Sequence, residues 1–274
     1  MYRFLPKRTL LNTFFRNFRR NGTDLATFPS VERQNTCLSV AGCSKEIQTE
    51  VLVPPVSSVS FHGRTLPSHL ISLESPEGQA LFAESFSSKH ATNFFPLITN
   101  FASQSDVAMC GPASLAMVLN ALRLDPQKTW KAPWRWWSDE MFACCEGSLR
   151  EMKQTGMTLQ FFDRIARSQP GIKVLTKSPE SLVEFEAALK QAAQEKNTHL
   201  IVSFSREALG QTGIGHFSPI AAVHPEKGLA LVLDVARFKY PPYWVRIEEL
   251  FEAMKHVDPS TKLPRGYSLI LREQ

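Results

Sequence analysis

The chain has 274 residues, of which 43% are hydrophobic and 21% charged, and its formal net charge is +5. These values are typical of a globular protein with one sizeable domain. No run approaches the ~18 apolar residues of a membrane-spanning helix, so we expect no membrane partner. The odd number of cysteines, five, and the lack of a secretory signal argue against a disulfide scaffold and for a reducing compartment.

The positive charge is concentrated in residues 1–22, which contain no acid and six basic residues: Arg3, Lys7, Arg8, Arg16, Arg19 and Arg20. The rest of the chain therefore carries 5 − 6 = −1, which does not support a nucleic-acid-binding core. Basic residues beside a helical stripe of Leu11, Phe14, Phe15 and Phe18 are typical of an organellar presequence. We expect residues 1–59 to be a mitochondrial presequence with a linker. A plastid transit peptide and a disordered basic tail on a cytoplasmic protein are the alternatives.

The folded domain is expected over residues 60–274 and opens with a helix over 75–86. Ser75 is placed to cap that helix, Pro76 occupies its first position and Glu77 its first turn. A second helix is predicted from Cys110 to Leu122. Because this helix is apolar around most of its circumference, it should be the buried central helix of the domain.

A tryptophan-rich segment, 130–137, is followed by two predicted helices, around 148–168 and 179–195. The pattern then changes to apolar and period-two runs, which predict strands over 199–205, 216–223, 229–236 and 266–272. Helices followed by an antiparallel sheet indicate an α+β domain.

His216 and Asp234 lie on the two strands of a predicted hairpin whose turn is near residue 226. Folding there places His216 opposite residue 235 or 236, within side-chain reach of Asp234. A carboxylate in so apolar a strand needs a partner, and an imidazole beside it would be fixed in one tautomer. The pairing leaves the other ring nitrogen free to accept a proton.

Cys110, at the start of the central helix, supplies a candidate nucleophile, and the helix dipole and an imidazolium would both lower its pKa. Gln104, six residues earlier, could donate its amide to an oxyanion. Each residue also has a structural interpretation. Cys110 could be a small core residue, His216 a structural histidine, and Asp234 a turn cap or the partner of Arg237. Together they favour a cysteine catalyst of the triad type.

Three stretches resemble the catalytic domain of phytochelatin synthase: "SQSDVAMCGPASLAMVLNALRLDPQKTWKAPWRWWSDEMFACCE", "GQTGIGHFSPIAAV" and "LALVLDVARFKYPPYWV". The similarity runs from about residue 61 to about residue 273. It implies a papain-like fold, with Cys110, His216 and Asp234 as the triad and Gln104 as the oxyanion donor.

The resemblance also implies a reaction. Cys110 would cleave the Cys–Gly bond of glutathione, form a γ-glutamylcysteinyl thioester and pass that unit to a second glutathione or a phytochelatin. Heavy-metal ions such as Cd²⁺, Zn²⁺ and Cu²⁺ would stimulate transfer, chiefly as their glutathione-thiolate complexes, and no organic cofactor is implied. Such an enzyme would serve metal detoxification.

Further positions match family residues near the substrate: Arg237, Lys239, Tyr240 and Arg265. Cys144 and Cys145 match a vicinal pair with a proposed metal-sensing role, although two adjacent cysteines are too few ligands for a structural zinc site. The competing functions are a glutathione hydrolase that releases γ-glutamylcysteine and glycine, a papain-like peptidase, and a non-catalytic metal- or thiol-binding protein. Whether the protein forms a homodimer is left open.

Residues 1–60 fused to a fluorescent reporter should direct it into mitochondria, because their basic, acid-free composition suits import. Fluorescence microscopy with a mitochondrial marker measures this. A diffuse cytosolic signal would contradict the presequence.

Overall fold

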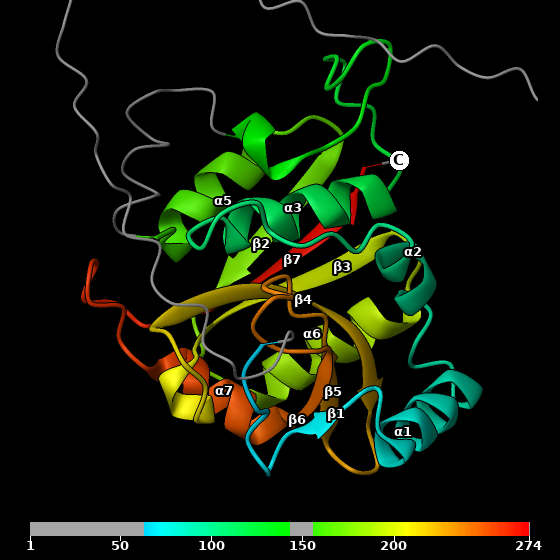
Figure 1. Ribbon diagram of the computed structural model, residues 1–274, viewed down its shortest axis with the longest axis vertical. Helices are drawn as coiled ribbons and strands as arrows, with labels where there is room; N and C mark the ends of the chain where they lie inside the picture. Colours follow the sequence, from blue (N-terminus) through cyan, green and yellow to red (C-terminus); the bar gives the residue numbers. More distant parts are fainter. Residues whose placement is uncertain (1–62, 143–155, 274) are drawn as a thin grey trace, which may run out of the picture. The chain divides into compact units, whose positions relative to one another are not determined.

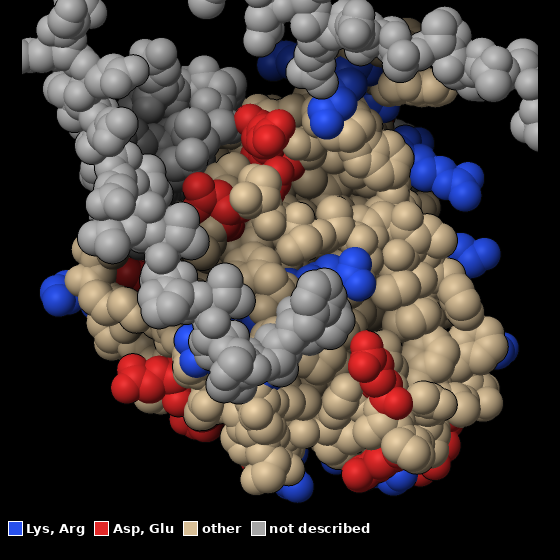
Figure 2. Space-filling view, in the orientation of Figure 1, with Lys and Arg blue, Asp and Glu red and all other residues tan. Residues whose placement is uncertain are grey.

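The computed structural model describes residues 63–142 and 156–273 (Figure 1). The expected presequence and linker, residues 1–59, lie outside the described residues, and so do Cys144 and Cys145. On the face of the molecule in Figure 2, basic and acidic side chains are interspersed with uncharged surface. No helix among the described residues is long and apolar enough to cross a bilayer.

The centre of the fold is a seven-stranded sheet in which every neighbouring pair is antiparallel. Its strand order is β1-β6-β5-β4-β3-β7-β2. The strands are β1 (Ile71–Ser72), β2 (Ile172–Lys177), β3 (Thr198–Ser205), β4 (Gly215–His224), β5 (Leu229–Val232), β6 (Tyr243–Arg246) and β7 (Gly266–Arg272). Mixed helices and antiparallel strands confirm the α+β class.

Helices cover both faces of this sheet (Figure 1). The helices are α1 (Pro76–Ser87), α2 (Phe94–Ile98), α3 (Cys110–Ala121), α5 (Leu159–Arg167), α6 (Leu182–Gln194) and α7 (Ile247–Lys255), with short 3₁₀ turns at η1 (Asp139–Phe142) and η2 (Glu207–Leu209). One core forms between the sheet and α1, α2, α3 and α5, and the other between the sheet and α6 and α7.

Strand β3 shows how the sequence builds both cores. Leu200, Val202 and Phe204 belong to the core under α6 and α7, whereas Ile201 belongs to the core under α3. All eight residues of β3 are buried, since β4 and β7 flank it and helices cover both faces. The continuous apolar run in the sequence reflects this double burial.

Helix α3 is the buried central helix that the sequence predicts, and its residues from Cys110 to Leu119 are all buried. From this helix, the Ser114 hydroxyl donates a hydrogen bond to the backbone carbonyl of Phe217 in β4, at 3.1 Å. This buried hydrogen bond fixes the helix against the strand that carries His216.

The structure corrects the predicted strand over 229–236, because β5 ends at Val232. Leu233 still donates to the carbonyl of Pro219 at 3.0 Å, but Pro219 has no N–H with which to complete the pair. A register shift between Ile220 and Ala222 adds to the irregularity. Asp234 therefore lies beyond the strand, in a segment that leaves the ladder.

Several elements were not expected from the sequence: β1, α2, β2, β6 and α7. Strands β1 and β6 are short, with two and four residues, and α2 has only five, which is too short for a periodic signal. The predicted helix around 148–168 corresponds to α5, which begins only at Leu159 because Thr158 caps it; residues 156–158 are not helical, and 148–155 lie outside the described residues.

His199 in β3 generates a stability prediction. Its side chain is fully buried, neither ring nitrogen has a hydrogen-bond partner among the described residues, and burial lowers its pKa to about 4. Between pH 6.5 and 4 the unfolded chain binds a proton that the folded protein does not. The free energy of unfolding should therefore decrease as the pH falls through this window.

Relative to pH 7, this one histidine should cost about 2 kcal/mol of stability at pH 5. His199→Leu should lose correspondingly less stability than the wild type, as measured by urea unfolding at the two pH values. His69→Leu, at an exposed position, is the control and should follow the wild type. Equal acid losses in His199→Leu and the wild type would refute the assignment.

Candidate active site

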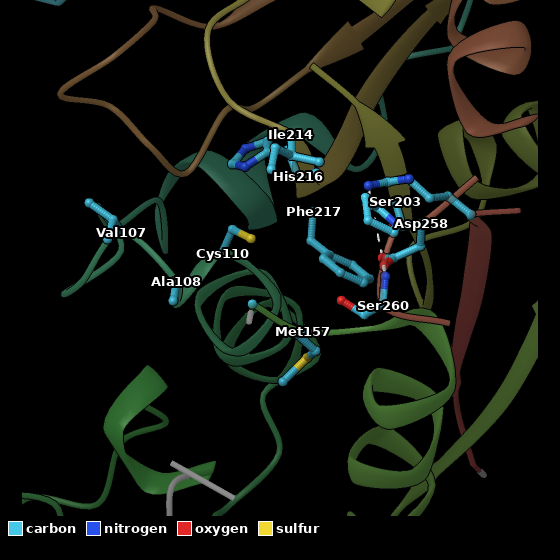
Figure 3. Close-up of a pocket in the computed structure, with 14 residues that line it drawn as sticks. Val107, Ala108, Cys110, Met157, Ser203, Ile214, His216, Phe217, Asp258 and Ser260 are labelled. Carbon is cyan, nitrogen blue, oxygen red and sulfur yellow. Dashed lines mark hydrogen bonds and ion pairs between the residues drawn. The ribbon is translucent and has the colours of Figure 1, made fainter. Parts of the chain in front are cut away.

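The nucleophile candidate lies where the first turn of α3 meets the start of β4. Cys110 is the first residue of α3, and Met109 at the N-cap position provides no side-chain cap. Cys110 and His216 line the same cavity of about 140 Å³ (Figure 3). The helix N-terminus therefore points its uncapped N–H groups toward this cavity.

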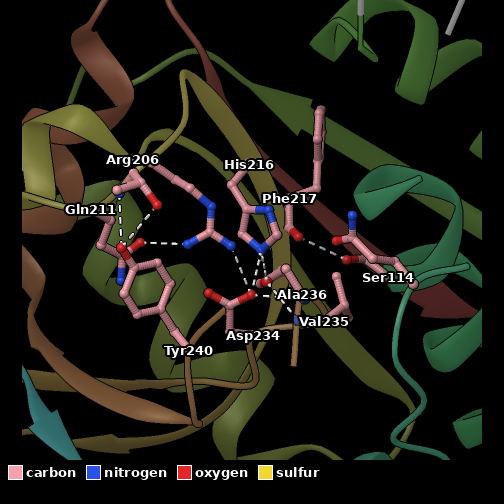
Figure 4. Close-up of polar contacts among 12 residues, drawn as sticks. Ser114, Arg206, Gln211, His216, Phe217, Asp234, Val235, Ala236 and Tyr240 are labelled. Atoms are coloured by element: carbon pink, nitrogen blue, oxygen red, sulfur yellow. Dashed lines mark hydrogen bonds and ion pairs between the residues drawn. The ribbon is translucent and has the colours of Figure 1, made fainter. Parts of the chain in front are cut away.

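His216 and Asp234 form the hydrogen-bonded pair that the hairpin geometry predicts. His216 Nε2 lies 2.8 Å from Asp234 Oδ1, and both side chains are almost completely buried (Figure 4). The polar contacts of the ring with described residues, to Asp234 and to Ser218 Oγ at 2.9 Å, both engage Nε2. Nδ1 is thus the nitrogen available on the cavity side to accept a proton.

Burial and charge set the protonation states of this pair. Burial, the largest cause, and the charge of Arg206 together lower the pKa of His216 to about 4, although Asp234 opposes them. Burial alone would raise the pKa of Asp234, but His216 and Arg206 outweigh it and hold that pKa well below its usual value. At neutral pH the pair is therefore a carboxylate and a neutral imidazole.

The thiol differs from its sequence-based expectation. Burial raises the pKa of Cys110 above its ordinary value, although backbone hydrogen bonds from Phe217 and Gly111 and the charge of Arg206 act in the opposite direction. The expected lowering was wrong because Cys110 is only 8% exposed and its imidazole neighbour is neutral. The resting site thus holds a thiol and a neutral base, and not an ion pair.

The side chain of Gln104 is engaged in the loop of residues 101–109 that leads into α3, which we call the nucleophile loop. Its amide Nε2 donates to the carbonyls of Asp106 at 2.7 Å and Val107 at 3.0 Å. Its backbone N–H donates to Val235 O at 2.9 Å. Gln104 therefore ties the nucleophile loop to the segment that carries Asp234, and it does not line the cavity of Cys110.

The buried carboxylate has a cationic partner that the sequence reasoning missed. Arg206 Nη2 lies 2.9 Å from Asp234 Oδ1, whereas Arg237, the cation considered from the sequence, stacks on the ring of Phe101 at 4.8 Å. The turn-capping alternative is also present, since Ala236 N donates to Asp234 Oδ1 at 2.9 Å. In the sequence, the one signal that could have identified Arg206 as the partner of Asp234 is a cation that directly follows an apolar strand.

The predicted substrate residues fall into two groups. Arg265 lines the cavity of Cys110 together with Asp258, and its guanidinium lies 3.8 Å from that carboxylate. Burial lowers the pKa of Arg265 below its ordinary value, with Asp258 opposing the shift. This cavity thus places a cation and an anion near the thiol.

Arg237, Lys239 and Tyr240 instead line a second pocket, of about 400 Å³, together with Arg64 and Glu74. Three cations and one carboxylate make this pocket positive. Tyr240 is only 2% exposed, and its hydroxyl accepts a hydrogen bond from Thr212 N at 2.8 Å. It therefore forms part of the wall and braces the loop before β4.

No group of three or more His, Cys, Asp or Glu side chains over 63–142 and 156–273 is arranged to hold a metal ion. Cys144 and Cys145, the sequence-based metal candidates, lie outside the described ranges.

Comparison with known proteins adds a family match. The family model described as phytochelatin synthase matches residues 61–267. Glutathione gamma-glutamylcysteinyltransferase 3 of Lotus japonicus is 42% identical over 217 residues, covering 78% of this chain and 45% of that protein.

Two further relatives are glutathione gamma-glutamylcysteinyltransferase 1 of Triticum aestivum and the glutathione gamma-glutamylcysteinyltransferase of Schizosaccharomyces pombe. The wheat protein is 43% identical, with coverage of 78% of this chain and 43% of the relative. The yeast protein is 37% identical, with coverage of 77% and 51%. The chain thus spans about half the length of the curated relatives it matches.

Gln104→Ala should slow alkylation of Cys110 by iodoacetamide, because two hydrogen bonds of about 1 kcal/mol each no longer hold the nucleophile loop. Mass spectrometry of the peptide containing Cys110 measures the rate. Alkylation forms no oxyanion, so an unchanged rate would contradict the loop-holding role and leave oxyanion binding as the function of this side chain. Gln169→Ala, at a side chain bonded to Ile165 and Ser168, is the control.

Proposed function

Because the chain belongs to the phytochelatin synthase family, we propose that it transfers the γ-glutamylcysteinyl unit of glutathione. The observation that carries this proposal is the cavity in which Cys110 and His216 lie beside the oppositely charged Asp258 and Arg265. A papain-like fold is part of the proposal. It is supported by a nucleophile at the start of a buried helix that packs on an antiparallel sheet bearing the histidine.

Acylation follows from the protonation states of the resting site. Neutral His216 takes the thiol proton of Cys110 through Nδ1 as Sγ attacks the carbonyl carbon of the Cys–Gly bond. Asp234 holds the ring through Nε2 and stabilises the imidazolium that forms. The imidazolium then gives its proton to the leaving amine of glycine, and a thioester remains on Cys110.

The oxyanion of this step needs hydrogen-bond donors near the thiol. The backbone N–H of Cys110 is suited to this role, since the helix N-terminus has no side-chain cap. Gln104 would join it only by releasing one of the carbonyls to which its amide donates, that of Asp106 or of Val107.

The γ-glutamyl end of glutathione is a zwitterion, with an α-amino and an α-carboxylate group. Arg265 can receive that carboxylate, and Asp258 can receive the ammonium group. An ordinary α-linked peptide carries no such zwitterion at this distance from the scissile bond. The charged pair therefore supports specificity for γ-glutamyl substrates.

A second substrate must approach the thioester for transfer. The positive pocket lined by Arg64, Arg237 and Lys239 suits the carboxylates of a second glutathione or a phytochelatin. Its α-amine would attack the thioester and displace Cys110, whereas attack by water would give hydrolysis. Heavy-metal ions such as Cd²⁺ would act by presenting glutathione as a metal thiolate, in the service of metal detoxification.

Purified protein incubated with glutathione should release glycine and form γ-glutamylcysteinyl oligomers, with more oligomer when Cd²⁺ is added. Liquid chromatography with mass spectrometry measures both products. Cys110→Ser should lower glycine release by at least about 10³-fold, because the hydroxyl is a far weaker nucleophile in this site. The α-linked isomer Glu-Cys-Gly is the matched control substrate and should not be cleaved.

Each of the other possible outcomes would identify a different activity. Glycine release without oligomers identifies a glutathione hydrolase, and cleavage of both isomers identifies a general peptidase. If Cys110→Ser still releases glycine, the assigned nucleophile is wrong. No glycine release by the wild type, with or without Cd²⁺, would reject the enzymatic proposal in favour of a metal- or thiol-binding protein.

A further inference from the structure

Arg206 is a buried cation directly behind the catalytic pair. It follows the last residue of β3 and is only 2% exposed. A buried charge is costly unless it is paired and hydrogen-bonded, and Arg206 has both kinds of partner (Figure 4). Its burial beside a catalytic carboxylate raises the question of what it contributes there.

Asp234 Oδ1 is the point on which the network converges. It lies 2.9 Å from Arg206 Nη2 and 2.8 Å from His216 Nε2, and it accepts from Ala236 N at 2.9 Å. Three donors around one oxygen fix the carboxylate in position and orientation. Since this oxygen orients the imidazole, the position of Arg206 determines where His216 Nδ1 points.

Arg206 is itself fixed on three sides. Its Nη1 donates to Gln211 Oε1 at 2.6 Å, and its guanidinium lies over the ring of Tyr240, 5.3 Å from the centroid. Its backbone N–H donates to Ile214 O at 3.0 Å. Gly213, with a φ of +115°, lies so close that a Cβ there would be 3.3 Å from the Cδ of Arg206.

The charge of Arg206 acts on both partners of the proton transfer. It favours the thiolate of Cys110 and disfavours the imidazolium of His216. The other charges that act on His216 are Asp234, which favours the imidazolium, and Lys239, which disfavours it. Loss of Arg206 should therefore make both the thiol and the imidazole hold protons more strongly.

We propose that Arg206 is a positioning residue that fixes the Asp234 carboxylate and, through it, His216, and that its charge sets the pH range in which Cys110 is reactive. The role differs from substrate binding, because the guanidinium acts from behind the imidazole through Asp234. Of the two measurements that test this inference, only glycine release from glutathione rests on the proposed function.

The test compares the wild type with Arg206→Met and Arg206→Lys across pH. One readout is alkylation of Cys110 by iodoacetamide, followed on the peptide that contains it, and the other is single-turnover glycine release from glutathione. Arg206→Met should move both profiles to higher pH by about one unit, because a nearby buried cation is lost. Arg206→Lys should leave the profiles near those of the wild type but lower the maximal glycine release about tenfold or more. A single ammonium keeps the charge but cannot bond Asp234 and Gln211 as the guanidinium fork does.

Arg246→Met is the matched control. It removes the same charge at an exposed arginine whose partner is Glu248, so its profiles should coincide with those of the wild type. If Arg206→Met also leaves both profiles unmoved, or if Arg206→Lys shifts them as much as Arg206→Met does, the proposal is overturned.

Gln211→Glu keeps the test decisive if Arg206→Met does not fold by circular dichroism. A carboxylate against Nη1 offsets the charge of Arg206 without removing the side chain, so the alkylation profile should again move to higher pH. An unmoved profile in this variant refutes the proposal. A wild type that cleaves no glutathione while the alkylation profiles shift as expected would reject the proposed function and support the role of Arg206.

Discussion

The neutralisation of one buried carboxylate is the constraint on which the site depends. Asp234 is fully buried, and no folded protein keeps an isolated carboxylate there at acceptable cost. Arg206 supplies the opposite charge and His216 a hydrogen bond, and both side chains contact the same oxygen, Asp234 Oδ1. The chain segments that carry these side chains are consequently held in a single arrangement, which is also the one that the proposed chemistry at Cys110 requires.

The sheet delivers these side chains from distant parts of the sequence. Arg206 comes from the end of β3, His216 from the start of β4, and Asp234 from the segment that follows β5. Pro219 interrupts the ladder at the point where this last segment must diverge. Gln104 then joins the diverging segment to the nucleophile loop through Val235.

The sequence allowed much of this site to be predicted, because its strongest signals are local. The capped start of α1, the apolar α3 and the His216–Asp234 hairpin depend on neighbouring residues or on one turn. Arg206 could not be chosen in this way, because its pairing depends on which strands are adjacent in the sheet. Arg237 was considered as the partner of Asp234 only because the two residues are close in sequence. The direction of the pKa shift of Cys110 could not be predicted from the sequence either, since it depends on how completely α3 is buried.

The strand order has a consequence for how the protein is made. Strand β3 lies between β4 and β7, so β3, which ends at Ser205 directly before Arg206, lacks one neighbour until residues 266–272 have been synthesised. Pairings between segments so far apart in sequence form late during folding. Until β7 pairs with it, β3 presents one unpaired edge, and the segment that continues into Arg206 is held in the sheet by β4 alone.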